Sequence, residues 1–89
     1  MKAIVTVSGK DKTGIIAGVS EVLSGNGVNI LDISQTVLQD YFAMIMLVDL
    51  TGCGVSFSVL RERLETIGKQ LNMDVRIMRE EIFDAMHRL

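Results

Sequence analysis

Six segments with a strand-like or helical apolar pattern follow one another along the 89-residue chain, and their order is its strongest constraint on the fold. Runs that are apolar or alternate with period two predict strands, and apolar residues spaced three and four apart predict helices. Strand patterns cover residues 3–8, 28–38, 41–50 and 73–79, and helical patterns cover residues 15–24 and 57–71. The predicted order is therefore strand, helix, strand, strand, helix, strand.

This order is the split βαβ arrangement, in which right-handed crossovers place both helices on one face of the sheet. We therefore expect an α+β protein with a ferredoxin-like βαββαβ sandwich and a four-stranded antiparallel sheet. Residues 1–79 would form one domain, since 89 residues lie just below the usual size of a single domain. Residues 80–89 predict a short amphipathic C-terminal helix, docked on the domain or on a neighbour, with apolar side chains at Ile82, Phe83, Met86 and Leu89.

Two of the predicted strands differ in how their faces are patterned. In residues 28–38, Leu31, Ile33 and Val37 alternate with polar side chains, which predicts one buried face and one wetter face. Residues 41–50 are apolar on both faces, which is typical of a strand in the middle of a sheet. Because 48% of this short chain is hydrophobic, we expect apolar surface to remain for a partner and a homo-oligomer to form.

Composition argues against several functional classes. The net charge is −2 with dispersed charges, and aromatic residues are only 4% of the chain, so nucleic-acid binding is not expected. One cysteine, Cys53, and one histidine, His87, are too few for a usual zinc site, and no metal or cofactor is expected. The sequence also has no apolar run of about 20 residues and no secretory signal pattern, so we expect a cytoplasmic protein away from membranes.

Enzyme chemistry finds little support in the sequence. Residues 9–14 lack the Cys-x-x-Cys of a metal chaperone of this fold, and no arginine precedes Arg61, as a small phosphatase would require. Neither Cys53 nor His87 has a recognisable activating partner nearby in sequence. We therefore expect no catalytic residues.

The loop after the first strand is the first half of a candidate binding site. Asp11 or Thr13 could cap the helix that follows, because a side-chain oxygen there can accept a backbone N–H bond. The helix start at Gly14 and Ile15 combines unpaired N–H groups with the positive end of a helix dipole, which suits a carboxylate.

The start of the second strand is the other half. The amide of Asn29 can donate to a carboxylate or accept from an ammonium group, with Ile15 and Ile30 as apolar walls. Together the two halves could bind the head group of an amino acid. A purely structural alternative stays open, in which the loop caps and turns and Asn29 closes a turn.

The same residues resemble the ACT domain, a small ligand-sensing module attached to many amino-acid metabolic enzymes. The resemblance rests on Asp11-Lys12-Thr13-Gly14-Ile15, on Gly27-Val28-Asn29-Ile30, and on the helix face of Val19, Val22 and Leu23. A chain with one such domain and a short tail is similar to the small free-standing bacterial ACT proteins, which are related to glycine cleavage system regulator proteins.

This resemblance implies how the protein would work. ACT domains associate in pairs, often edge to edge through the second strand, and bind an amino acid between the first loop of one subunit and the second strand of the other. By position, Asp11, Thr13, Gly14 and Ile15 would form the loop side, and Asn29 and Ile30 the strand side. The expected function is a regulatory homodimer that signals to a separate metabolic enzyme or regulator. The alternative is a protein-interaction domain without a ligand.

Overall fold

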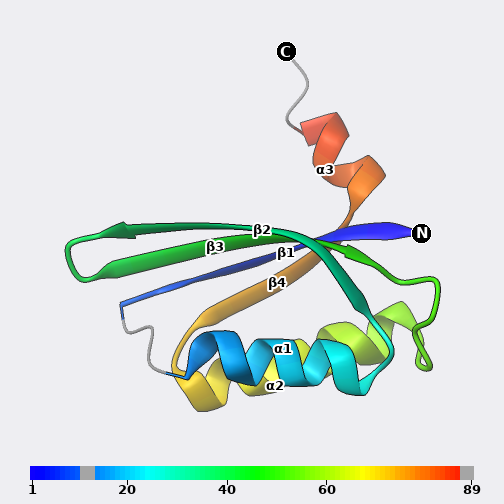
Figure 1. The fold of residues 1–89 in the computed structure, drawn as a ribbon, viewed down its shortest axis with the longest axis horizontal. Coiled ribbons are helices and arrows are strands. Elements are labelled where there is room, and N and C mark those ends of the chain that lie inside the picture. Colours follow the sequence, from blue (N-terminus) through cyan, green and yellow to red (C-terminus); the bar gives the residue numbers. More distant parts are fainter. Residues whose placement is uncertain (11–13, 87–89) are drawn as a thin grey trace.

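The computed structural model describes residues 1–10 and 14–86. The elements are β1 (Lys2–Gly9), α1 (Ile15–Gly25), β2 (Asn29–Leu38), β3 (Tyr41–Asp49), α2 (Phe57–Leu71), β4 (Asp74–Arg79) and α3 (Glu80–Met86). The strands form an antiparallel sheet in the order β2-β3-β1-β4. Figure 1 shows α1 and α2 on one face of the sheet and α3 on the other. The predicted ferredoxin-like fold with a short C-terminal helix is confirmed.

The core lies between the sheet and helices α1 and α2, and its strand residues come from β1, β3 and β4. These residues alternate along each strand, as the period-two pattern predicts: Ala3, Val5, Val7, Phe42, Met44, Met46, Val48, Val75 and Ile77. The helices contribute Ile15, Val19, Leu23, Leu60 and Leu64. The prediction that residues 41–50 form a central strand is confirmed, since β3 lies between β2 and β1.

The prediction of a buried face on the second strand is wrong. β2 is an edge strand, and only Ile30 among its residues is half-buried, while Ile33 and Val37 are 39% and 52% exposed. The buried core side chains on the helix-covered face belong to the other three strands, and of β2 only Ile30 packs against them. An irregularity in the pairing between Ile30 and Asp32 also shifts the alternation, so Leu31 is 43% exposed.

The start of α1 also differs from the expected cap. Gly14 occupies the N-cap position in a left-handed conformation with φ of 74°, and it has no side chain that could accept a hydrogen bond. The predicted capping residues, Asp11 and Thr13, lie outside the described residues. By contrast, α2 has a conventional cap, because the Ser56 side chain accepts from the Val59 N–H at 3.2 Å.

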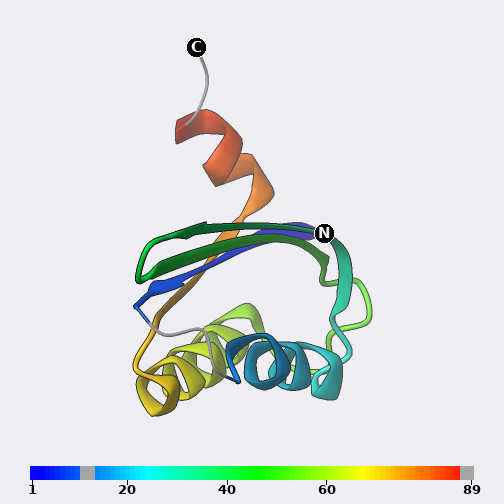
Figure 2. The same ribbon diagram turned by 60° about the vertical axis from the view of Figure 1, so that its left-hand side comes forward.

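Helix α3 projects from the sheet instead of lying flat on it, as Figure 2 shows. None of its residues is buried, and Ile82 and Met86 are 49% and 64% exposed. The predicted docking on the domain is thus partial, with half-buried Phe83 as one point of contact with the sheet. His87 and Leu89 lie outside the described residues. No helix within residues 1–10 and 14–86 is long and apolar enough to cross a membrane.

Candidate functional site

The loop half of the candidate site is the first turn of α1. Its backbone N–H groups have no partner within the helix until the Gly18 N–H, which donates to the Gly14 carbonyl at 2.9 Å. No acidic residue lies in this turn, so the positive end of the helix dipole is not offset there. The Ile15 side chain is buried in the core, so Ile15 offers its N–H and not an apolar wall.

The strand half begins after a tight turn that only glycine allows. Gly27 has φ of 79°, and a Cβ atom there would lie 2.2 Å from the Gly52 carbonyl oxygen. This close approach of two loops lies directly before β2, which begins at Asn29. Asn29, the first residue of β2, is exposed, and Ile30 packs half-buried against the core.

Asp49 is a neighbour of Asn29 that reasoning from the sequence missed. The two residues are register partners in the β2-β3 pair. Hydrogen bonds from the Thr51 hydroxyl at 2.7 Å and the Thr51 N–H at 3.0 Å lower the pKa of Asp49, and the Met1 ammonium lies 3.8 Å away. A negative charge therefore stands beside Asn29 at neutral pH. A hairpin with its turn at residues 39–40 pairs positions at equal distances on either side of that turn, which would have placed Asn29 opposite residue 50, one position from Asp49.

The two halves do not meet within one chain. Gly14 precedes α1 and Asn29 follows it, and a helix of 11 residues is about 16 Å long at a rise of ~1.5 Å per residue. Figure 1 shows the end of α1 close to the start of β2, whereas the start of α1 lies at the other end of the helix, beside the end of α2. The residues predicted to bind one ligand thus lie at opposite ends of a helix.

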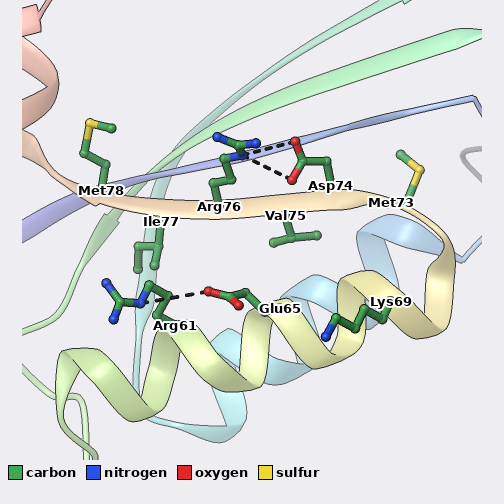
Figure 3. Close-up of a pocket in the computed structure, with 9 residues that line it drawn as sticks. All are labelled: Arg61, Glu65, Lys69, Met73, Asp74, Val75, Arg76, Ile77 and Met78. Carbon is green, nitrogen blue, oxygen red and sulfur yellow. Dashed lines mark hydrogen bonds and ion pairs between the residues drawn. The ribbon is translucent and has the colours of Figure 1, made fainter.

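A groove of about 470 Å³ lies between α2 and the outer side of β4, away from both halves. Figure 3 shows charged side chains from both elements along it. Arg76 Nε lies 3.1 Å from an Asp74 carboxylate oxygen, and Arg61 Nε lies 3.9 Å from Glu65 Oε1. Because these charges already have partners within their own elements, the groove does not point to a particular ligand.

Metal and thiol chemistry have little basis in the described residues. Within residues 1–10 and 14–86, no three His, Cys, Asp or Glu side chains are grouped as metal ligands. Cys53 is half-buried against the core, and its thiol donates to the Val55 carbonyl at 3.3 Å. This contact gives Cys53 a structural role in the loop before α2.

Known proteins resemble the whole described fold. A UPF0237 protein of Clostridium acetobutylicum is 54% identical over 89 residues, covering 100% of both chains. An ACT domain protein from Streptococcus pneumoniae has a solved structure with a TM-score of 0.82 and 48% identity, covering 98% of each chain. A protein named for transcriptional repression of the glycine cleavage system has a TM-score of 0.65 and 25% identity, over 86% of this chain and 44% of that one.

The ACT domain family model matches residues 2–78, which run from the start of β1 nearly to the end of β4. Members of this family are regulatory ligand-binding modules. The sequence and the fold agree on the assignment, and the chain therefore belongs to the ACT domain family.

Proposed function

We propose that this protein is a regulatory homodimer that binds a small amino acid or a related carboxylate and signals to a separate protein. The observation that carries the proposal is the separation of Gly14 and Asn29 at opposite ends of α1, next to an unpaired edge strand. A second subunit can bring together what one chain keeps apart. The proposal places the protein in the cytoplasm, where its free thiol at Cys53 would stay reduced.

Pairing of two β2 strands supplies the required geometry. Around a two-fold axis the paired strands run antiparallel, so the start of one β2 lies beside the end of the other. The end of β2 is also the end of the sheet at which α1 begins (Figure 1). Edge pairing would therefore bring Asn29 of one subunit toward the α1 start of its partner.

The charges of the two halves match those of an amino acid. The N–H groups in the first turn of α1 suit the carboxylate, and no acidic residue lies within that turn. The Asn29 amide oxygen can accept from the ammonium group, and Asp49, which already has the Met1 ammonium 3.8 Å away, adds negative charge beside it. Ile30 stays in the proposal as an apolar wall beside Asn29, and Asp11 and Thr13 stay as loop residues of the site.

The first test is a thermal-shift screen against the twenty amino acids and common small carboxylates. A ligand at 100 times its Kd should stabilise the fold by about 2.7 kcal/mol, which raises the Tm of so small a domain by several degrees. Asn29→Ala should abolish that shift, whereas Gln70→Ala, which removes an exposed amide on α2, should retain it. A flat screen on the folded dimer would refute the ligand proposal.

The second candidate function is a protein-interaction domain without a ligand. The exposed apolar side chains of the β2-β3 hairpin favour it, notably Val37, Leu38 and Tyr41. This function predicts the same flat screen together with a stable complex with another protein. The screen thus separates the two candidates.

A further inference from the structure

The turn between α1 and β2 determines how Asn29, in the strand half of the candidate site, is presented. Gly27 in this turn has φ of 79°. Glycine has more backbone freedom than any other residue, so the direction in which β2 leaves the turn depends on the contacts of the residues beside Gly27. On one side, Val28 is buried and its N–H donates to the Leu23 carbonyl at 2.9 Å. On the other side lies Asn26.

Asn26 makes hydrogen bonds to three parts of the chain. Its side-chain amide donates to the Val22 carbonyl at 2.6 Å, which ties it to the last turn of α1. Its carbonyl accepts from the Gly54 N–H at 3.0 Å, which ties it to the loop before α2. Its side-chain oxygen accepts a hydrogen bond from the Arg63 guanidinium of α2. Asn26 therefore joins α1, α2 and the loop before α2, three residues ahead of Asn29.

Arg63 also supplies a positive charge that α1 itself lacks. Within the described residues of α1, no basic side chain lies in the last turn, although the carbonyl groups there form the negative end of the helix dipole. The Arg63 guanidinium donates to Asn26, the C-cap residue of α1, so it offsets that charge and fixes the Asn26 side chain at the same time. Because Arg63 is exposed and lies outside the core, the fold does not depend on its side chain.

We propose that Arg63 is a positioning residue for amino-acid binding, which acts through Asn26 to hold the turn that presents Asn29. This inference rests on the proposed function, in which Asn29 contacts the amino acid. Without the guanidinium, the turn would populate several directions of β2, and only a fraction of the molecules would be ready to bind. Removing the Arg63 guanidinium should therefore weaken binding without removing any group that contacts the amino acid.

The test is calorimetry on the full chain with the amino acid that gives the largest shift in the thermal screen. Arg63→Met should weaken binding several-fold, and Arg63→Lys, which keeps a cationic donor, should restore most of the affinity. The control is Arg61→Met on the same helix, because the Arg61 guanidinium pairs with Glu65 at 3.9 Å instead (Figure 3). Both arginines are exposed, so all variants should stay folded by circular dichroism. Equal affinities of Arg63→Met and the unsubstituted protein would overturn the proposal.

A double substitution tests the route through Asn26. Asn26→Ala removes the acceptor of the Arg63 guanidinium, so this variant should also bind more weakly. Adding Arg63→Met to it should weaken binding little further, because the contact between the two side chains is already lost. Losses that multiply in the double variant would mean that Arg63 acts by another route, and would overturn the proposal.

A measurement without any amino acid separates this proposal from the proposed function. Hydrogen exchange of the Gly54 N–H, which donates to the Asn26 carbonyl, reports on how firmly the turn is held. This exchange, followed by NMR, should be several-fold faster in Arg63→Met than in Arg61→Met, and equal rates would overturn the proposal. Faster exchange in Arg63→Met, with no amino acid bound by the unsubstituted protein, would refute the proposed function and leave Arg63 as a residue that holds the turn.

Discussion

The two edge strands, β2 and β4, have similar alternating sequences but opposite surroundings. Val75 and Ile77 of β4 lie in the core beneath α2, whereas Ile33 and Val37 of β2 are exposed. The groove along β4 is lined by charged side chains from β4 itself and from the neighbouring α2 (Figure 3). By contrast, β2 contains one charged residue, Asp32. Because charges on an edge strand oppose pairing with other chains, their scarcity favours β2 over β4 as the edge for the proposed pairing.

The largest expected effect is on the free energy of unfolding, when the same Ile→Ala substitution is made on each of the two edge strands. Ile77→Ala should lower the free energy of unfolding by about 2–5 kcal/mol, because it leaves a cavity in the core. Ile33→Ala should cost less than about 1 kcal/mol at low protein concentration and more as the concentration rises, since β2 would be covered only by a partner. Urea denaturation measures both values. Equal costs at low concentration would contradict the difference between the edges.

The next effect concerns pairing of the β2 edge. Ser34→Glu with Thr36→Glu adds two acidic side chains to each β2. In a dimer paired through β2, four acidic side chains would lie close together and repel one another, so the mass in solution should halve. Both residues are exposed, so the subunit should stay folded by circular dichroism. The control is Ser58→Glu with Gln70→Glu, which adds two acidic side chains at exposed positions of α2. A mass equal to that of the control would exclude pairing through β2.

The smallest effect concerns the charge beside the start of β2. Thr51→Val removes the hydroxyl that donates to Asp49, so the lowered pKa of Asp49 should rise toward its ordinary value. The lowered pKa means that Asp49 favours folding above its unfolded-state pKa and loses this contribution as the pH falls through the folded-state pKa. NMR titration of the carboxyl group measures the shift. An unchanged pKa would mean that the Met1 ammonium or the Thr51 backbone N–H, and not the Thr51 hydroxyl, lowers the pKa of Asp49.

Much of the fold could be predicted from the sequence because the core is periodic. The buried positions of β1, β3 and β4 follow period two, and Leu60 and Leu64 follow the helical spacing. The exposure of β2 could not be predicted, since Ile33 and Val37 show the same alternation whether a helix of the same chain covers them or another chain does. Periodicity identifies an apolar face without identifying what covers it.

The candidate site was predictable only in part. The residue types at Gly14 and Asn29 indicated ligand chemistry, and the length of the helix between them already implied their separation. The position of Asp49 depends on the register of the β2-β3 pair, which an irregularity near Leu31 shifts. Local sequence therefore indicates the groups of the site but not how many chains are needed to build it.

The most direct test of the shared site mixes two inactive variants. Gly14→Val disturbs the loop half, because a β-branched residue is strained at φ of 74°, and Asn29→Ala removes the strand half. Each variant alone should fail to bind the amino acid that stabilises the unsubstituted protein most strongly. After subunit exchange in equal amounts, a site shared between two chains predicts recovery of about a quarter of the binding capacity, because half of the dimers regain one of two sites. Calorimetry that finds no recovery, although mass spectrometry detects the mixed dimer, would contradict the account.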